Sequence, residues 1–425
     1  MKMPCDTISK RASRRRHPRC LVALMAGLLA GLCGISARAQ QAVDTADLFA
    51  DTWVATDGLG RTLPGADTCG APRPGKKVAL FYWTWHIRAN GASRDPLDNS
   101  RITTRALIEG KPAEWPSFRA NHFWGEPELG YYLSNDPFVA RRHASLLADA
   151  GVDVLVFDTT NPPWTWKEAY MALAREFTAM RQEGNRTPDI AFMCPFGDPS
   201  VVVKRVVDEL YGPGLYRDLW FMWDDRPLIL ANPRHFRDIP EILNLFTFRQ
   251  PIPGYWTRPS APGQWPWLQV FPQYAFPNSA GDPEVVAVGV AQNAIAGARG
   301  PAPMSHKQGA MGRSWHDGAR DPDPAAIDLG LNFKEQWDRA MALDPQVVFV
   351  TGWNEWTAIR LPTFGPYNER EHPYHRRGLF IDQYNREYSR DCEPMKGGHE
   401  DAYYYQLTAN IRRFKGVRPP PQPGG

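Results

Sequence analysis

The stretch QVVFVTGWNEWTAIR, residues 346–360, joins an apolar run to a group of tryptophans around one acidic residue. The run Val347–Val350 is typical of a buried strand, and Glu355 follows it between two tryptophans. A carboxyl group at the end of a core strand is either part of a chemical site or a buried group that the structure holds for its own stability.

Seven more segments upstream of this stretch have the character of buried strands. They are residues 78–85, 152–158, 189–194, 227–231, 242–248, 267–271 and 284–290. Helical patterns separate several of them. One helix should begin after Asp136 and Pro137 and end at Gly151, and a capping box of Thr165 and Glu168 should open the next. Further helices are expected at 198–210, 333–343 and 403–414.

Apolar strands without clean alternation, separated by amphipathic helices, indicate a parallel sheet that is covered on both faces. Eight such units in one domain favour a single (β/α)8 TIM-type barrel over a doubly wound sheet. The nucleotide-binding alternative lacks its signals, because the sequence has neither a G-x-G-x-x-G after an early strand nor a P-loop.

The first 39 residues have the pattern of a signal peptide. An arginine-rich start is followed by a short apolar core at 21–35 and by the small-x-small stretch ARA at 37–39. We therefore expect cleavage after Ala39 and an exported protein, periplasmic or extracellular. The remaining chain divides into a lead-in segment at 40–76, the barrel at 77–417 and a disordered Pro/Gly-rich tail at 418–425.

Charge and cysteine content limit the partners. The chain has 49 Lys+Arg and 46 Asp+Glu, and removal of 1–39 takes away eight basic residues and one acidic residue, which leaves 41 against 45, a net charge of −4. This balance predicts neither a nucleic-acid partner nor, after signal cleavage, a membrane surface. We expect a monomer.

Cys69, Cys194 and Cys392 remain after cleavage, so at most one disulfide can form within the chain.

In a (β/α)8 barrel the functional site lies where the strands end. The residues that should converge there are Trp83, Trp85, His86, Asp158, Cys194, Asn232, Gln292, Asn293, Asn354 and Glu355. The longest connections, 87–135, 249–283, 291–331 and 357–400, should cover the same face, and loops of this length usually serve function.

Glycosidic bonds are usually cleaved by two carboxyl groups, one a proton donor and the other a nucleophile or base. Glu355 is the first candidate, because flanking aromatic rings exclude water and raise a carboxyl pKa. Three partners are open: Asp158, which otherwise caps a loop, and Asp391 or Glu393, which otherwise belong to a surface loop paired through Arg390. Glu126 or Glu128 could also supply the partner from the pocket rim.

Aromatic and hydrogen-bonding side chains near these acids are the expected substrate ligands, since flat apolar rings stack on sugars. The candidates are Trp83, Trp85, His86, His122, Trp124, Glu126, Asn293, Trp353, Asn354 and Trp356. Half of the tryptophans could equally be core residues, and Glu126 could cap a turn. No metal-ligand spacing and no G-x-S-x-G elbow is present, so we expect neither a metal nor another cofactor.

Three stretches resemble known enzymes. FYWTW at 81–85, the segment 124–158 and TGWNEW at 351–356 are similar to glycoside hydrolase families 71 and 99 and their bacterial relatives. The resemblance implies a (β/α)8 barrel that acts on polysaccharides or glycans; family 99 cleaves internal α-mannosides.

In family 99 the matching motif is Asn-Glu-Trp-x-Glu, which places its first glutamate at Glu355. The second glutamate, the family's general acid, is replaced by Ala358. The departure leaves three readings open: a glycoside hydrolase with its second carboxylate elsewhere, a non-catalytic carbohydrate-binding barrel, and a transglycosylase.

Overall fold

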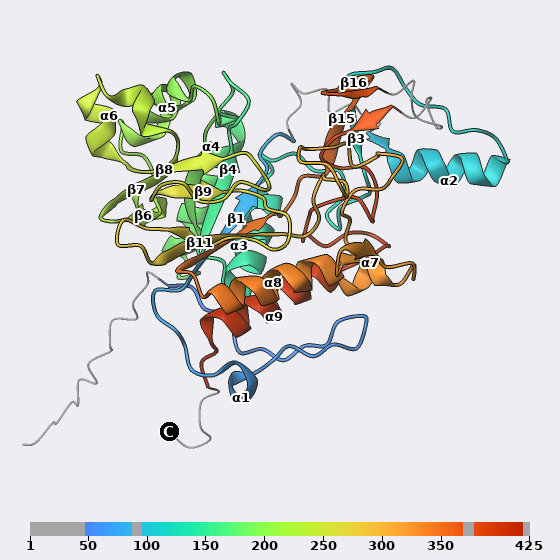
Figure 1. Cartoon of the computed structure of the whole chain (residues 1–425). Coiled ribbons are helices and arrows are strands. Elements are labelled where there is room, and N and C mark those ends of the chain that lie inside the picture. The colour runs from blue at the N-terminus through green and yellow to red at the C-terminus, as the bar shows by residue number, and fades with distance from the viewer. Residues whose placement is uncertain (1–46, 87–95, 369–377, 420–425) are drawn as a thin grey trace, which may run out of the picture. The chain divides into compact units, whose positions relative to one another are not determined.

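The computed structural model describes residues 47–86, 96–368 and 378–419, and eight parallel strands form its centre (Figure 1). The strands are β1 (Lys77–Tyr82), β4 (Val154–Asp158), β5 (Asp189–Met193), β7 (Arg226–Leu230), β8 (Thr247–Ile252), β9 (Gln264–Pro266), β11 (Pro283–Gly289) and β14 (Val347–Thr351). Hydrogen bonds join them in the order β11-β14-β1-β4-β5-β7-β8-β9, and β9 lies against β11. The sheet is thus the expected (β/α)8 barrel. The expected signal peptide lies outside the described residues.

Helices surround this barrel and cover the outer face of its strands (Figure 1). The longer ones are α3 (Pro137–Ala150), α4 (Lys167–Gln182), α5 (Ser200–Val206) with the π-helical turn η2 (Val207–Tyr211), α6 (Pro240–Leu245), α8 (Leu331–Leu343) and α9 (Ala402–Lys415). Helix α3 begins and ends as the sequence indicates, because Asp136 accepts bonds from the first free amides and Gly151 closes the helix in the left-handed conformation.

Strand β1 shows why the strands lack alternation. Val78, Leu80 and Tyr82 pack against the helices, whereas Ala79 and Phe81 fill the interior of the barrel. Both faces of β1 are therefore shielded from water, and every position from Val78 to Tyr82 is apolar or aromatic. The same parity carries past the strand ends and aims alternate residues into the mouth of the barrel.

Three sequence expectations need correction. Helix α4 has no capping box: it begins after Trp166 without a side-chain cap, and the Thr165 hydroxyl bonds to Glu209 instead (2.8 Å). The fifth strand was expected at 242–248, but Pro240 opens α6 there and the strand starts at Thr247. The sixth strand was expected at 267–271 and lies at 264–266.

Long connections build a second, smaller sheet over the C-terminal end of the barrel. Its order is β18-β15-β3-β2, from residues in two connections far apart in the chain, and α2 projects beside it (Figure 1). These elements are β2 (Leu97–Asp98), α2 (Asn99–Glu109), β3 (Asn121–Phe123), β15 (Thr357–Leu361) and β18 (Leu379–Phe380). The small remaining elements are α1 (Ala66–Cys69), η3 (Arg217–Leu219), β6 (Met222–Trp223), η4 (Pro233–Phe236), β10 (Phe276–Pro277), β12 (Trp315–His316), β13 (Ala319–Arg320), α7 (Ala326–Leu329), β16 (Thr363–Phe364) and β17 (Tyr367–Asn368).

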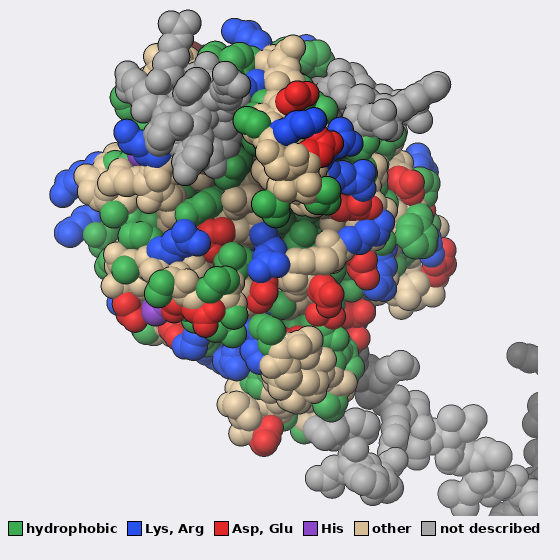
Figure 2. All heavy atoms as spheres, turned by 90° about the vertical axis from the view of Figure 1, so that its right-hand side faces the viewer, with side chains coloured by type: hydrophobic (Ala, Val, Ile, Leu, Met, Phe, Trp, Pro, Cys, Tyr) green, Lys and Arg blue, Asp and Glu red, His purple; other side chains and the backbone are tan. Residues whose placement is uncertain are grey.

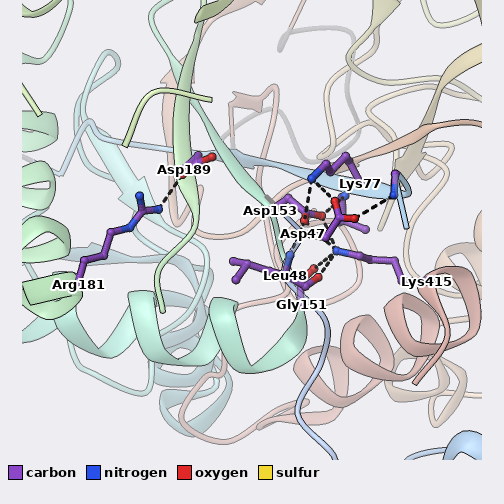
Figure 3. Close-up of polar contacts among 10 residues, drawn as sticks. Asp47, Leu48, Lys77, Gly151, Asp153, Arg181, Asp189 and Lys415 are labelled. Carbon is purple, nitrogen blue, oxygen red and sulfur yellow. Dashed lines mark hydrogen bonds and ion pairs between the residues drawn. The ribbon is translucent and has the colours of Figure 1, made fainter. Parts of the chain in front are cut away.

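A buried ionic cluster lies at the opposite, N-terminal end of the barrel (Figure 3). The Lys415 ammonium at the end of α9 contacts both oxygens of Asp153 (2.7 and 2.8 Å), and Lys77 pairs with Asp47. The amide of Leu48 donates to the same Asp153 carboxylate (2.9 Å). The cluster therefore joins the lead-in segment, β1, the start of β4 and the last helix.

The surface does not carry a single sign of charge on the face shown in Figure 2, where Lys/Arg and Asp/Glu side chains are interspersed. Within the described residues, no helix is both long and apolar enough to span a bilayer. Cys69, Cys194 and Cys392 are all free thiols.

Candidate active site

A pocket of about 530 Å³ opens at the C-terminal end of the barrel. Its wall contains residues from the ends of five of the eight strands: Trp83 after β1, Asp158 at the end of β4, Phe196 after β5, Trp267 after β9 and Glu355 after β14. The barrel rule thus places the pocket correctly, and it brings together two of the four carboxyl groups that the sequence proposed.

Four tryptophans form a row along one wall of this pocket. Trp83 stacks on Trp85 with ring centroids 5.0 Å apart, Trp85 lies 4.8 Å from Trp166, and Trp166 stacks on Trp164 at 6.0 Å. Trp83 is buried, whereas Trp164 at the other end is 57 % exposed. The inner rings of the row lie against one another, and Trp164 at the solvent end offers the exposed aromatic surface that suits a sugar ring.

Asp158 faces the pocket because Val154 and Val156, four and two residues earlier in the strand, fill the barrel interior, and alternate residues of a strand point to the same side. Its Oδ1 accepts a bond from the Thr160 amide (3.0 Å), and its backbone carbonyl accepts one from the Trp85 indole (3.0 Å). Burial raises the pKa of the Asp158 carboxyl to about 6, against the lowering effect of the hydrogen bonds from Thr160. The residue therefore also fixes the aromatic wall.

Glu355 reaches the pocket beside a buried arginine. Arg390 Nη2 lies 2.7 Å from Glu355 Oε2 and 3.2 Å from Asp382 Oδ1, so one nitrogen joins two carboxyl groups. Arg390 Nη1 donates to Asn293 Oδ1 (3.0 Å), and the guanidinium lies over the Trp267 ring. These contacts with two carboxyl groups, an amide and an indole ring fix the position of the guanidinium.

The pKa of Glu355 lies above its ordinary value. Burial is the main cause; Arg390 lowers the pKa, and the charges of Asp382 and Asp391 raise it again. The upward direction prevails because a single guanidinium is shared between two carboxyl groups in a site with little water. Glu355 is thus suited to hold a proton near neutral pH.

The sequence also proposed Asp391 and Glu393, and both lie next to the Glu355 segment but outside the pocket. Asp391 is fully buried, where it accepts bonds from the Glu355 amide (2.6 Å) and from the Trp124 indole (3.2 Å). Its carboxyl therefore holds the backbone that carries Glu355.

Glu393 is the centre of a buried network behind the site. It accepts a bond from the Tyr132 hydroxyl (2.7 Å), contacts His143 Nε2 (2.8 Å) and also accepts one from the Trp356 indole. Trp356 stacks on Trp124 inside the core, and Trp353 is likewise fully buried. These three tryptophans support the site from behind and do not line the pocket.

The remaining proposed ligands divide into supporting and distant groups. Asn354 clamps the peptide of Trp83, with Oδ1 accepting from its amide (2.8 Å) and Nδ2 donating to its carbonyl (3.0 Å). His86 Nε2 contacts the Asn354 carbonyl (3.0 Å), and burial lowers the pKa of this ring to about 4. Asn293 also accepts a bond from Tyr255.

His122 and Glu126 lie away from Glu355. His122 Nδ1 faces Asn99 (3.0 Å), and burial lowers the pKa of the ring to about 4. Glu126 bridges Arg101 and Lys396, each at 2.6 Å, at the edge of a separate hollow of about 690 Å³. The three strand-end residues Cys194, Asn232 and Gln292 are not in the wall of the Glu355 pocket either.

Sequence reasoning missed Asp382, Trp166 and Trp267 and assigned Arg390 to other partners. Asp382 follows the apolar residues Leu379 and Phe380 of β18, a strand too short to give a periodic signal. Among the described residues, no group of three or more His, Cys, Asp or Glu side chains is placed to hold a metal ion.

No family model matches the chain, and no curated protein matches it. Solved structures with a similar fold include two of the GH99 endo-alpha-mannosidase from Bacteroides thetaiotaomicron. The complex with Bis-Tris-propane has a TM-score of 0.44 at 15 % identity and covers 80 % of this chain and 97 % of that chain. The other structure has a TM-score of 0.43 at 14 % identity and covers 80 % and 98 %.

Proposed function

We propose that the protein is a glycoside hydrolase that cleaves glycosidic bonds of an oligo- or polysaccharide, with Glu355 as one of the working carboxyl groups. One observation carries the proposal: buried carboxyl groups whose pKa values are raised share one pocket with a row of four stacked tryptophans. The motif resemblance to families 71 and 99 supports the same class of reaction.

The chemistry requires a carboxyl group that keeps its proton beside the leaving oxygen and a second group that is ionised. Glu355 meets the first condition, because its raised pKa leaves a proton to donate. Asp158 and Asp382 lie in the same wall and are available for the second.

A non-catalytic carbohydrate-binding barrel is the second candidate, and Ala358 favours it. This alanine lines the pocket where the resembling family has its second glutamate. A binding protein would use the tryptophan row without the carboxyl chemistry, and a transglycosylase would use both but pass the sugar to an acceptor.

The test is release of new reducing ends from a panel of purified plant, fungal and bacterial polysaccharides and of N-glycans. A hydrolase releases them in water alone, a transglycosylase gives product only with added acceptor sugar, and a binding protein gives saturable binding without product. Glu355→Gln protein, purified in the same way, controls for contaminating enzymes. Saturable binding without any released sugar would contradict the proposal.

We further propose that the protein is exported and loses residues 1–39. Leu48, Phe49 and Ala50 are buried in the described structure, so cleavage after Ala39 leaves every buried anchor of the lead-in segment in the mature chain. The intact mass of protein recovered from the periplasm or medium tests the cleavage site, and a mass that includes residues 1–39 would contradict it.

A further inference from the structure

The pocket contains a third acidic residue, Asp382, which comes from the long connection after β15. It follows β18, the strand that pairs with β15, so the small sheet over the barrel mouth carries it to the pocket. Its side chain is 39 % exposed, whereas that of Glu355 is 10 % exposed. Asp382 therefore meets both the solvent and the buried guanidinium.

Arg390 limits how far apart Asp382 and Glu355 can be. The same nitrogen, Nη2, lies 2.7 Å from Glu355 Oε2 and 3.2 Å from Asp382 Oδ1. These two oxygens can be no farther apart than the sum of the two distances, about 6 Å, which is near the separation of about 5–5.5 Å between the two carboxyl groups of retaining glycosidases.

Each of the two acids keeps one oxygen for other use. Glu355 contacts Arg390 through Oε2, and Asp382 contacts Arg390 and Asn293 through Oδ1. No hydrogen bond joins Glu355 Oε1 or Asp382 Oδ2 to another described residue. Asp158 likewise uses only Oδ1, toward the Thr160 amide, but it is buried, and its backbone carbonyl holds the Trp85 indole.

We propose that Asp382 is the second catalytic residue of the pocket and acts as the nucleophile opposite Glu355; this inference rests on the proposed hydrolase function. The Asp382 carboxylate attacks the anomeric carbon, the bond from that carbon to the leaving oxygen breaks, and the leaving oxygen takes the proton of Glu355. Water then attacks the anomeric carbon of the glycosyl ester and gives a proton to the Glu355 carboxylate, and the ester bond breaks to release the Asp382 carboxylate.

Arg390 has a defined part in this division. Its guanidinium contacts the carboxyl groups of both acids, and burial holds the proton on Glu355 against the effect of this cation. Asp158 serves as a positioning residue that fixes the aromatic wall. The site thus obtains from β18 the carboxylate that Ala358 does not supply.

The experiment compares wild-type protein with Asp382→Asn, Asp158→Asn and the surface control Asp338→Asn on the glycan that the wild type hydrolyses in the panel. The Asp338 side chain is 52 % exposed on α8 and lies outside the pocket. We expect kcat of Asp382→Asn to fall at least about 10³-fold, Asp158→Asn to lose less, and the control to be unchanged. Urea unfolding checks that each variant is folded.

A second measurement identifies the nucleophile directly. The 2-deoxy-2-fluoro glycosyl fluoride of the released sugar is incubated with wild-type protein, and the labelled peptide is mapped by mass spectrometry. We expect the label on Asp382.

Hydrolysis by Asp382→Asn within about tenfold of wild type, or a label on Asp158, would overturn this inference and leave the hydrolase proposal standing. Absence of hydrolysis by the wild type would overturn both.

Discussion

At the scale of single residues, the site depends on one cation that faces several acids. The Arg390 guanidinium is almost fully buried and contacts Glu355 and Asp382 with the same nitrogen. A buried carboxyl group that shares its cation with a second carboxyl group keeps a raised pKa, whereas a cation paired with that group alone would favour its ionised form. The arrangement explains how a glutamate in a salt bridge can still serve as an acid.

Asp158→Asn gives a pH-dependent test at this scale. The pKa of Asp158 is raised from 3.8 to about 6, so the folded protein binds this proton more tightly than the unfolded chain does. The contribution of Asp158 to stability is therefore largest below pH 4 and is lost as the pH rises through 6. The variant lacks this titration.

We expect the free energy of unfolding of the wild type, relative to Asp158→Asn, to fall by about 2 kcal/mol between pH 4 and pH 7. Urea unfolding of both proteins at each pH measures this difference, and the exposed control Asp338→Asn should show little change. A difference that does not vary with pH would contradict the assigned environment of Asp158.

At the scale of elements, the eight strands could be predicted because both of their faces are buried. Val154, Val156 and Asp158 show this well: period-two parity alone places the aspartate in the barrel mouth. The predicted bounds of the fifth and sixth strands are wrong by three to five residues, because prolines and glycines interrupt the pattern between 251 and 266.

The segment that carries Glu355 is held in place by a second segment, residues 390–393, whose role the sequence does not indicate. Asp391 and Glu393 were expected in the site because their stretch has no evident structural purpose, but that stretch pairs with the segment after β14. Gly352 donates to the Arg390 carbonyl (2.9 Å), and Glu393 donates through its amide to Trp353 (3.0 Å). No local pattern in the sequence reveals such a pairing.

Glu393→Gln should therefore affect stability more than catalysis. The amide keeps one acceptor but turns a donor toward the Tyr132 hydroxyl, the His143 ring or the Trp356 indole. We expect the free energy of unfolding to fall by about 1–3 kcal/mol, with kcat of the folded variant within about tenfold of wild type. The exposed Glu128→Gln is the matched control.

Urea unfolding and steady-state assays on the same samples separate the two effects. If Glu393→Gln kept wild-type stability but lost activity as strongly as a variant of Glu355, the carboxyl would be a catalytic group after all.

At the scale of the whole molecule, the two ends of the barrel have separate tasks. The pocket lies at the C-terminal end, and the ionic cluster of Lys415, Asp153, Lys77 and Asp47 ties the chain together at the other end (Figure 3). Period-two parity places Glu355 and Asp158 at the pocket, but no local pattern indicates the ionic cluster or the place of Arg390, because Arg390 and Lys415 contact residues 35 and 262 positions away in the chain.

Lys415→Met should destabilise the protein without changing its chemistry. It leaves the buried Asp153 carboxylate without its ammonium partner, which typically costs about 3–5 kcal/mol. We expect kcat to be unchanged at temperatures where the variant is folded. The exposed Lys334→Met is the control, and Lys415→Met with Asp153→Asn should regain part of the loss. A melting temperature of Lys415→Met equal to that of wild type would contradict this role.

The central claim is that Glu355 performs chemistry in a sugar-binding pocket. The most direct measurement is kcat of wild type and Glu355→Gln on the same glycan, together with the Kd of both proteins from calorimetry. The account predicts a loss in kcat of about 10²–10⁴-fold with Kd changed by less than about tenfold, because the amide keeps the shape of the side chain but has no proton to donate. A variant that releases sugar at the wild-type rate would contradict the account.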